Sequence, residues 1–438
     1  MAEKMKPSGI DWIGDIPNNW ETSRIKYHYQ ISLGKMLQPI QENSTDTLEH
    51  YMCSANITWA GVDTSILKQM WFSPAEKKQY RLLDGDLLVS EGGDVAVSCI
   101  WRNELDECYL QNAVHRVRQN ALSDNRFIYY WLFFLKNYGI VDLICNKATI
   151  AHFTKEKFGE LPICIMSIDE QVAIADFLDK ECAQIDSIAA DLEKQIALLQ
   201  QYKKSLITET VTKGLDKSVP MKDSGVEWTS KIPCHWEIKR FKYLCEYITD
   251  GSHFSPETTD EGYPYITAAD VKGVGLDYDA AKKISQQDFT SLRKAGCQPR
   301  KGDVLLVKDG ATTGRIGMVT SEKPCVVLSS VAILRAPDNM DARYLHYLME
   351  SDFVQAQIQA SMAGSAMPRT VLSKIINYWG ITCPKEEQKE ICDFLDRKCG
   401  YIETVIETKQ VQQSTIQQHK KSLIYEYVTG KKRVKEVR

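Results

Sequence analysis

Hydrophobic residues recur at alternating steps of four and three positions along residues 178–199. Narrow apolar stripes with this spacing are typical of a long helix that packs lengthwise against a second helix. No Gly or Pro interrupts residues 168–213, and Gly214 suits a helix end. At about 1.5 Å per residue, some 40 residues would form a rod of roughly 60 Å. The stripe consists of Leu178, Cys182, Ile185, Ala189, Leu192, Ile196 and Leu199.

A second stripe lies near the end of the chain and predicts a helix over residues 385–429. Leu395, Cys399, Ile402 and Ile406 keep the same spacing, and polar residues then occupy seam positions before Ile416. Polar seam residues commonly fix the register of paired helices. Two interpretations remain: each helix lies inside its own domain core, or the two form an antiparallel coiled coil. We expect the coiled coil, because two equivalent modules pair most simply about a pseudo-twofold axis.

The chain contains a long internal repeat. The segment from Met5 to Tyr27 recurs as residues 221–243, residues 85–88 recur as 302–305, and residues 170–207 recur as 387–424. A period of about 217 residues far exceeds that of solenoid repeats, which run roughly 20–50 residues. The chain is therefore predicted to hold two complete modules, each a divergent globular part followed by a shared helix.

The globular parts are predicted to be α+β. Short apolar runs that follow Gly-Asp turns or stand alone indicate strands over residues 87–89, 304–307, 326–328 and 331–334. Asp124 and Asp341 are typical N-caps for helices over residues 127–136 and 344–349. The fold class we expect is thus two α+β domains separated by two long helices, with a pseudo-twofold internal repeat.

Composition narrows the function. The 438 residues are 43% hydrophobic and 26% charged, which fits a globular protein of more than one domain. The longest apolar run, residues 127–135, is far shorter than the ~20 residues of a membrane span, so we expect no membrane and a cytoplasmic protein. The 13 Cys are scattered without a Cys-x-x-Cys pair, which indicates reduced thiols and no structural zinc. A net charge of −4 counts against nucleic-acid binding, although a whole-chain sum can hide local basic surfaces.

Motifs for chemistry are missing from the sequence. Residues 310–317 hold the glycines of a nucleotide loop but neither its Lys nor its hydroxyl, so a turn between two strands is the better interpretation. Residues 91–94 form a short acidic turn without a nuclease-like Lys partner. We expect a binding protein with no catalytic residue and no bound metal. An unrecognised Cys or carboxylate hydrolase is the least favoured alternative.

The residues that open each module are Ser-Gly-Ile/Val-Asp/Glu-Trp, then Ile-Pro, then Trp-Glu. Together with residues 302–317 and the run from Cys383 to Asp396, they resemble the specificity subunit of type I restriction-modification systems, over essentially the whole chain. The first copy of that run departs slightly, since residues 166–168 lack the Pro.

This resemblance implies a division into four parts: target-recognition domain 1 over residues 1–166, a central helical spacer over 167–216, target-recognition domain 2 over 217–383 and a C-terminal spacer over 384–432. It implies a non-catalytic subunit that reads a bipartite, asymmetric site on double-stranded DNA. The helices would bind two methyltransferase subunits, and restriction/translocase subunits would complete the complex. S-adenosylmethionine, ATP and Mg²⁺ are expected in those partners and no cofactor in this chain.

Base readout favours Arg or Lys for guanine, Asn or Gln for adenine, and Ser, Thr or His as adaptable donors on loops. A solvated surface role is the alternative for each such residue. On this basis the predicted DNA-binding residues are Asn56, Lys68, Lys147, Thr149, His152, Ser252, His253, Lys308, Arg315, Ser365 and Arg369. The predicted partner-binding helix residues are Leu178, Ile185, Leu192, Leu199, Leu395, Ile402 and Ile416.

Two other classes of function remain open from sequence. One is a DNA-binding protein of the same fold that serves a defence or regulatory assembly without methylation. The other is a coiled-coil scaffold whose globular domains bind protein. Salt-sensitive, sequence-specific retention of DNA would separate a DNA reader from a scaffold.

Overall fold

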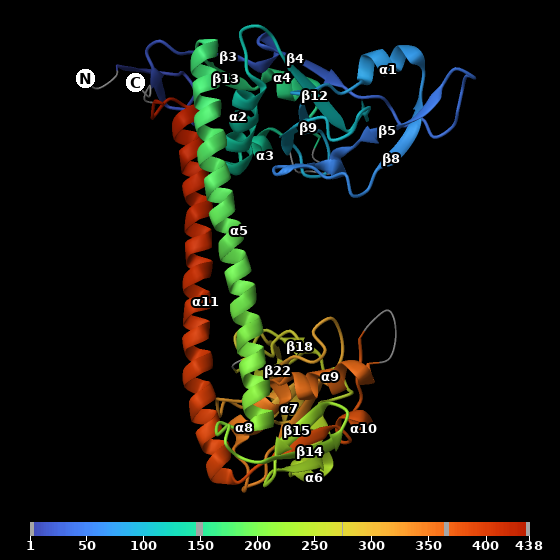
Figure 1. Ribbon diagram of the computed structural model, residues 1–438, viewed down its shortest axis with the longest axis vertical. Helices are drawn as coiled ribbons and strands as arrows, with labels where there is room; N and C mark the ends of the chain where they lie inside the picture. The colour runs from blue at the N-terminus through green and yellow to red at the C-terminus, as the bar shows by residue number, and fades with distance from the viewer. Residues whose placement is uncertain (1–3, 146–151, 274, 363–367, 435–438) are drawn as a thin grey trace. The chain divides into compact units, whose positions relative to one another are not determined.

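The computed structural model describes residues 4–145, 152–273, 275–362 and 368–434 (Figure 1). Contacts within the chain define two compact units. Unit 1 consists of Met1–Leu192 and Val411–Arg438, and unit 2 consists of Glu193–Gln410. Each unit therefore contains one globular half of the chain together with a segment of each long helix.

The globular half of unit 1 is α+β, as predicted. Its elements are β1 (Met5–Pro7), β2 (Asp15–Pro17), β3 (Glu21–Arg24), η1 (Ile25–Tyr27), β4 (Tyr29–Leu33), β5 (Thr47–Met52), η2 (Ser54–Asn56), β6 (Ile57–Thr58), β7 (Gly61–Val62), β8 (Lys68–Phe72), α1 (Pro74–Tyr80), β9 (Leu87–Ser90), β10 (Ser98–Ile100), β11 (Tyr109–Leu110), β12 (Val114–Gln119), α2 (Asn125–Asn137), α3 (Ile140–Ile144), α4 (Lys155–Glu160) and β13 (Pro162–Ile165).

Unit 2 repeats this order with local changes. Its elements are β14 (Met221–Val226), β15 (Thr229–Pro233), β16 (Glu237–Arg240), α6 (Phe241–Leu244), β17 (Tyr247–Asp250), β18 (Thr258–Thr259), β19 (Tyr263–Ile266), β20 (Lys282–Ile284), α7 (Gln286–Lys294), β21 (Val304–Val307), β22 (Ile316–Met318), β23 (Val326–Val327), β24 (Val331–Arg335), α8 (Ala342–Glu350), α9 (Asp352–Ser361), α10 (Leu372–Ile375) and β25 (Trp379–Thr382).

The main sheet of each unit has the same topology. It is antiparallel with the order β10-β9-β12-β4 in unit 1 and β22-β21-β24-β17 in unit 2. Successive side chains of a strand point to opposite faces, and the central strands are buried on both. Leu87 and Val89 enter the core shared with α2, whereas Leu88 enters a second core beneath β10 and β11. This two-sided burial explains why the strand sequences are continuously apolar.

Most sequence-based element predictions are confirmed. Asp124 caps α2 by accepting a hydrogen bond from the Arg126 amide (2.6 Å). Asp341 likewise caps α8 by accepting a hydrogen bond from the Arg343 amide (2.9 Å). Residues 310–315 form the turn between β21 and β22, as expected. Among the described residues, no helix combines the length and the apolar character that crossing a membrane would need.

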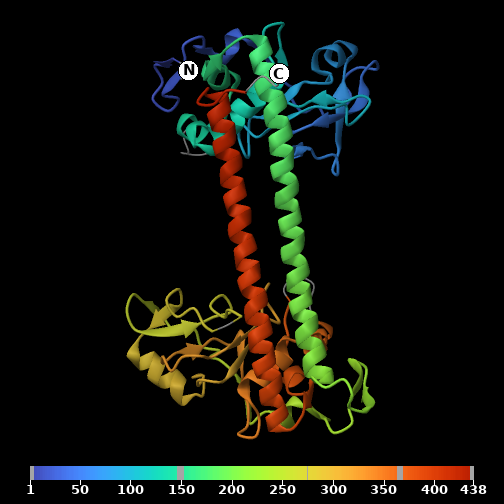
Figure 2. The same cartoon turned by 60° about the vertical axis from the view of Figure 1, so that its left-hand side comes forward.

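Both long helices are present: α5 spans Ile168–Lys213 and α11 spans Lys385–Val428. In unit 1, the Lys420 ammonium lies 2.7 Å from the Asp186 carboxylate, and the Phe177 and Tyr427 rings are 4.4 Å apart between centroids. As the residue number rises along α5, from 177 to 186, the number of the contacted residue in α11 falls, from 427 to 420, so the two helices run antiparallel. Figures 1 and 2 show the two helix segments side by side in this unit.

Unit 2 shows the same antiparallel pairing. Lys409 donates to the Gln195 side chain at 2.6 Å, and Lys203 forms an ion pair with Glu403. Lys203–Glu403 occupies the positions that Lys420–Asp186 occupies in unit 1, at the 217-residue offset. The predicted antiparallel coiled coil is thus confirmed, and the alternative of two helices in separate cores is wrong.

The predicted role of the seam residues needs correction. Leu178, Ile185 and Leu395 are buried in the cores that each unit forms with its own globular half, and Ile402 is buried as well. Leu192 is buried too, and Leu199 and Ile416 are half-buried. An apolar residue at four-three spacing faces the neighbouring helix of the same chain, so this side of the helix is not a free surface for a partner.

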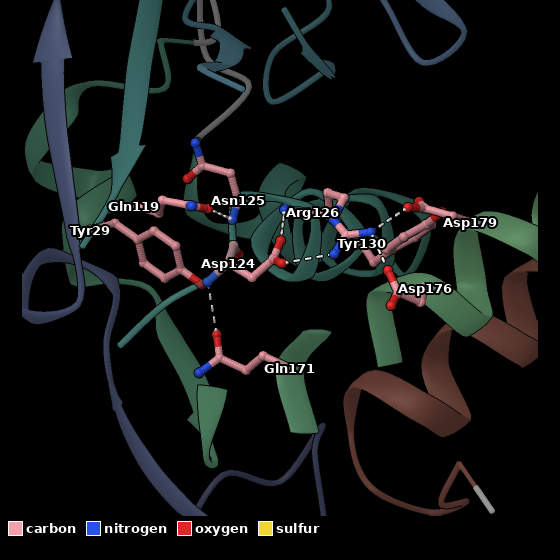
Figure 3. A network of polar contacts seen from close by, with 9 residues as sticks. All are labelled: Tyr29, Gln119, Asp124, Asn125, Arg126, Tyr130, Gln171, Asp176 and Asp179. Atoms are coloured by element: carbon pink, nitrogen blue, oxygen red, sulfur yellow. Dashed lines mark hydrogen bonds and ion pairs between the residues drawn. The ribbon is translucent and has the colours of Figure 1, made fainter. Parts of the chain in front are cut away.

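A polar network ties α2 to the first turns of α5 in unit 1 (Figure 3). The Arg126 guanidinium contacts three carboxylates, those of Asp124 (3.0 Å), Asp176 (2.5 Å) and Asp179 (3.0 Å). Tyr130 donates its hydroxyl proton to Asp179 at 2.7 Å. Charge-assisted hydrogen bonds of this kind are stronger and more directional than neutral ones, so the network fixes the angle at which α5 leaves the domain.

Unit 2 contains the same network at the 217-residue offset. Arg343 contacts Asp341 (2.8 Å), Asp393 (2.9 Å) and Asp396 (2.6 Å), and Tyr347 donates to Asp396 at 2.7 Å. The repeat is therefore preserved in the side chains that join domain to helix, and not only in the backbone.

The basic C-terminal segment contacts unit 1. Lys431 donates to the Asp15 carbonyl, Arg433 pairs with Glu170, and the Arg433 guanidinium lies 5.7 Å from the centre of the Trp20 ring. Residues 431 and 433 are therefore held against the unit 1 domain by ion pairs, hydrogen bonds and ring contacts. The positive φ of Gly430, 72°, lets the chain turn from α11 onto Trp20 and Pro17.

We predict that Ile185→Asp lowers the free energy of unfolding by roughly 3 kcal/mol or more, because it removes buried apolar contacts and places a carboxylate in the unit 1 core. Ile188 lies three residues along the same helix with 49% of its surface exposed. Ile188→Asp is the matched control and should cost less than about 1 kcal/mol. Thermal unfolding of the full chain measures both, and equal losses of stability would contradict the assigned faces of α5.

Candidate nucleic-acid interface

Three segments that are far apart in the sequence meet at one end of the unit 2 sheet: the end of β17, the end of β21, and residues 368–370. The Thr370 amide donates to the Lys308 carbonyl at 2.9 Å, and the Gly310 amide donates to the Pro368 carbonyl at 3.0 Å. Asp309 and Arg369 form an antiparallel bridge. Backbone hydrogen bonds therefore hold these loops together independently of their side chains.

Gly251 allows the first of these loops to approach the sheet. A Cβ at this position would lie 2.0 Å from the Val327 carbonyl oxygen, a distance that no side chain tolerates. The Gly251 amide donates to Val331, and the next amide, that of Ser252, donates to the Val327 carbonyl (2.9 Å). The close approach places the Asp250 carboxylate beside Lys308.

A chain of alternating charges runs through this cluster. The buried Lys308 ammonium lies 3.2 Å from the Asp250 carboxylate and 3.6 Å from that of Asp309. Asp309 in turn forms an ion pair with Arg369 at 2.9 Å, and Asp250 lies 3.2 Å from the His253 ring nitrogen. A buried lysine is tolerated only when its charge is compensated, so the pairing fixes both aspartates.

The outer members of this chain face the solvent. The side chains of Arg369 and His253 are 59% and 72% exposed, whereas that of Lys308 is 3% exposed. An oriented guanidinium and an imidazole are donors that match the guanine and adenine edges in the major groove. We name Asp250, His253, Lys308, Asp309 and Arg369 the unit 2 reading cluster.

The structure brings together four of the predicted unit 2 residues: Ser252, His253, Lys308 and Arg369. Two of them are not displayed as predicted. Lys308 is buried as the centre of the cluster, and Ser252 is buried with its hydroxyl bonded to the Phe254 carbonyl at 2.6 Å. Both shape the loops, so a direct base contact is expected only from the exposed members.

Arg315 does not join the cluster. It is exposed, and its guanidinium donates to the Val271 carbonyl at 3.4 Å, beside a separate cavity of about 300 Å³ that Lys203 and Glu350 also line. Ser365 lies outside the described residues. DNA contact by Arg315 therefore stays a prediction, at a place distinct from the reading cluster.

Unit 1 has the same backbone arrangement with different side chains. The Phe153 amide donates to the Glu91 carbonyl at 2.9 Å, as Thr370 does to Lys308. Gly34 corresponds to Gly251, since a Cβ there would lie 2.4 Å from the Gln111 carbonyl oxygen. The corresponding loop positions of unit 1 are thus Lys35, Met36, Glu91 and His152 in place of Ser252, His253, Lys308 and Arg369.

The chemistry of the two sites is therefore unlike. At the buried strand end, unit 2 has the cation Lys308 and unit 1 has the carboxylate Glu91. Burial raises the pKa of Glu91 above its usual range, and the neighbouring His152 partly offsets this rise. The cation of unit 1 comes instead from Lys35, which is buried and paired with Glu76. Sequence reasoning missed Lys35, although its position next to Gly34 repeats that of Ser252 next to Gly251.

The other residues of unit 1 that were predicted to bind DNA differ in their exposure. His152 is exposed at the site, as expected. Asn56 is buried: its amide donates to the Asp63 (2.8 Å) and Ile66 (3.1 Å) carbonyls and so closes a loop, which corrects its predicted display toward DNA. Lys68 is exposed at the start of β8, and its side chain forms no hydrogen bond or ion pair with the described residues of this site. Lys147 and Thr149 lie outside the described residues.

We predict that Lys308→Met lowers the free energy of unfolding by about 3 kcal/mol, because it leaves Asp250 without its buried counter-ion. The exposed Lys231 of the same unit is the control, and Lys231→Met should change stability by less than about 0.5 kcal/mol. Chemical denaturation of the full chain gives both values. A Lys308→Met chain as stable as the control would refute the structural role of the buried cation.

Comparison with known proteins agrees with this architecture. The family described as type I restriction modification DNA specificity domain matches residues 17–198 and again residues 233–413. The type I restriction enzyme MjaVIII specificity subunit of Methanocaldococcus jannaschii is 22% identical over 435 residues, which cover 96% of this chain and 95% of that protein. The EcoBI specificity subunit of Escherichia coli is 23% identical over 349 residues, covering 76% and 71%.

The fold is also found among solved structures. A chain from the structure described as the basis of complex assembly and conformational transition of the type I R-M system superposes with a TM-score of 0.72. The superposition covers 94% of this chain and 98% of the other. Because the two sequences are only 13% identical, the superposition shows a shared fold and nothing further. Because the family matches both halves of the chain, each over a globular part and its helix, the chain belongs to the type I restriction-modification DNA specificity family.

Proposed function

We propose that the chain reads a bipartite, asymmetric site on double-stranded DNA for a type I restriction-modification complex, one half-site for each unit. The observation that carries this proposal is that the loops at the strand ends have the same backbone arrangement in both units but carry different side chains. The loops of both units are held by equivalent backbone hydrogen bonds. The position of Lys308 in unit 2 is held by Glu91 in unit 1, and that of Arg369 by His152. Base edges are distinguished by donors and acceptors, so two such sites would select different bases.

The chain itself would make and break no bonds in this assignment. Methyl transfer and DNA cleavage would take place on companion methyltransferase and restriction/translocase subunits. S-adenosylmethionine, ATP and Mg²⁺ would bind there. The chain would contribute base recognition and the surface on which two methyltransferase subunits assemble.

The outer faces of the helices support this docking role. Large apolar side chains are normally covered, yet five of them are about half exposed or more along α5 and α11. Since the seam side of each helix is buried within the chain, the outward side is the surface left for a partner. These outward residues are Ile188 and Val411 in unit 1, and Leu198, Tyr202 and Tyr401 in unit 2.

We predict that Arg369→Ala relaxes recognition in one half of the methylated motif, and that His152→Ala relaxes the other half. Each loss of a base contact should cost about 1–3 kcal/mol of discrimination. Sequencing of methylated adenines genome-wide, in cells carrying each variant, measures the motif directly. An unchanged motif and methylation rate in both variants would refute the reading loops, and exchange of residues 221–380 for a divergent version should alter one half only.

We predict that Leu198→Asp and Ile188→Asp, singly or together, weaken co-purification of methyltransferase subunits with the tagged chain, while thermal unfolding of the chain stays near that of the wild type. The reason is that both side chains are exposed, 54% and 49%, and contribute little to the fold. Undiminished assembly of the double variant would contradict docking on the outward faces. The seam variant Leu192→Asp cannot make this distinction, because Leu192 is buried.

A further inference from the structure

The turn before the central strand is a second place where the two units share a backbone and differ in charge. In unit 2, the Arg300 amide donates to the Asp303 carboxylate at 2.7 Å, and the Asp303 amide donates to the Arg300 carbonyl at 2.9 Å. In unit 1, Leu83 and Asp86 form the same two bonds, at 2.9 and 3.0 Å. The turn reads Arg-Lys-Gly-Asp over 300–303 and Leu-Asp-Gly-Asp over 83–86.

A cavity of about 490 Å³ opens beside the unit 2 turn. Its lining is strongly basic and aromatic, and it consists of Tyr247, Arg293, Gly296, Gln298, Arg300 and Arg335. Gly296 keeps the space open, because its φ is 85° and a Cβ there would lie 3.0 Å from the Tyr247 hydroxyl oxygen. We name this cavity the three-arginine pocket.

One of the three arginines is held in place by the fold. Arg335 binds the buried Asp303 carboxylate through two parallel bonds, 2.8 Å from Nε and 2.7 Å from Nη2. This fork-to-fork pairing neutralises Asp303 and orients the guanidinium. Its third nitrogen, Nη1, has no hydrogen-bond acceptor in the part of the chain that the structure describes.

The other two arginines carry uncompensated charge. Arg293, in the last turn of α7, and Arg300 are both exposed, and within the described ranges neither has a carboxylate at ion-pair distance. The Asp303 carboxylate raises the pKa of Arg335, with a smaller contribution from Glu246, which does not line the pocket. The pocket therefore presents three guanidinium groups to a single space without a free carboxylate.

The cavity beside the unit 1 turn has the opposite character. A smaller cavity of about 210 Å³ is lined there by Leu83, Asp84, Gly85, Asp86, Arg118, Gln119 and Asn125. Its single arginine, Arg118, is bound to Asp86 at 2.6 and 2.9 Å, and Asp84 adds a negative charge. Arg118 corresponds to Arg335 at the 217-residue offset, whereas the lining of the unit 1 cavity holds no arginine that corresponds to Arg293 or Arg300. The shared scaffold thus does not require Arg293 and Arg300, and a ligand would account for their presence.

We propose that the three-arginine pocket binds a phosphate group of the DNA backbone and so anchors the duplex that unit 2 reads. Guanidinium groups match the geometry of phosphate oxygens and remain charged at every physiological pH, and the Tyr247 hydroxyl and the Gln298 amide add neutral donors. This inference rests on the proposed DNA-reading function. It adds a sequence-independent contact that only one of the two units possesses.

The position of the pocket suits such an anchor. Tyr247 and Asp250 stand at opposite ends of β17, so the pocket and the reading cluster are separated by roughly 10 Å along the strand. Successive phosphates of one DNA strand are spaced by about 3.4 Å along the helix axis, so base readout and phosphate anchoring would fall within a few base pairs of each other. The pocket also supplies local positive charge in a chain whose net charge is −4.

The test measures salt dependence, because each phosphate contact adds about 0.9 to the slope of log K against log salt. The complex isolated on the tagged full-length chain is titrated with a fluorescent 40-base-pair duplex between 50 and 300 mM KCl. The variants are Arg300→Leu, which installs the unit 1 residue, and Arg293→Ala. The control is Lys78→Ala, which removes an equal charge from the exposed surface of the equivalent helix α1 in unit 1.

We expect each pocket variant to reduce the slope by about 1 and to weaken binding 3- to 10-fold at 150 mM salt, with the methylated motif unchanged. Lys78→Ala should leave the slope unaltered. Parallel lines for wild type and variants, with sequence preference retained, would overturn the pocket as an anchor and leave the proposed function standing. A wild-type complex that shows no sequence preference would instead count against the proposed function.

A second arm separates the DNA backbone from free phosphate. Calorimetric titration with inorganic phosphate, at constant ionic strength, tests whether the pocket takes the free anion. Saturable binding below about 1 mM that Arg300→Leu abolishes, together with an unchanged DNA slope, would show an anion site that does not serve DNA and would overturn the assignment. Weak or undetectable phosphate binding together with the reduced DNA slope supports the backbone as the source.

Discussion

The structure depends on the burial of one apolar seam by two distant parts of the chain. A single helix of more than 40 residues with a narrow stripe cannot cover that stripe alone, and isolated helices gain most of their stability from such packing. In unit 1, Leu178 and Ile185 of α5 enter the same core as Leu423 and Val428 of α11. In unit 2, Ile207 and Val211 of α5 share a core with Leu395 of α11. Neither unit is therefore complete without residues from both halves of the sequence, and the arginine–aspartate networks at the helix starts fix each domain to this pairing.

The two copies of the domain show which parts of the fold are constrained and which side chains can differ. The central strands are buried on both faces, so their residues are constrained by two cores at once. The loops at the strand ends are held by backbone bonds and by the close approach of Gly34 and Gly251, which leaves their side chains free to differ. The turn between β6 and β7 illustrates the same freedom. Trp59 in this turn packs against Phe133 with ring centroids 5.0 Å apart, whereas the position of Phe133 is held by Glu350 in unit 2, at the 217-residue offset.

Charge is organised locally rather than across the chain. The net charge of −4 does not indicate a DNA-binding surface, yet unit 2 gathers Arg293, Arg300 and Arg335 in one cavity and exposes Arg369 in the reading cluster. Carboxylates in both places are consumed by internal pairs, Asp303 with Arg335 and Asp250 with Lys308. Because Asp303 and Asp250 are neutralised within the protein, the exposed Arg293 and Arg300 keep their positive charge, which reconciles an acidic chain with the recognition of an anionic polymer.

The sequence by itself determined the repeat, the two long helices with their antiparallel pairing, the caps at Asp124 and Asp341 and the family. The helices and their caps follow from periodicity and local preferences, which depend on neighbours a few residues away. The repeat and the pairing follow from the similarity of segments about 217 residues apart. It also located the segments that form the unit 2 reading cluster. Only the tertiary structure decided which of their side chains face outward: Asn56, Ser252 and Lys308 are buried, Arg315 lies elsewhere, and Lys35 and the three-arginine pocket went unnoticed. Burial and ion pairing depend on residues that are tens to hundreds of positions apart, as Asp309 and Arg369 are, and no local pattern encodes those contacts.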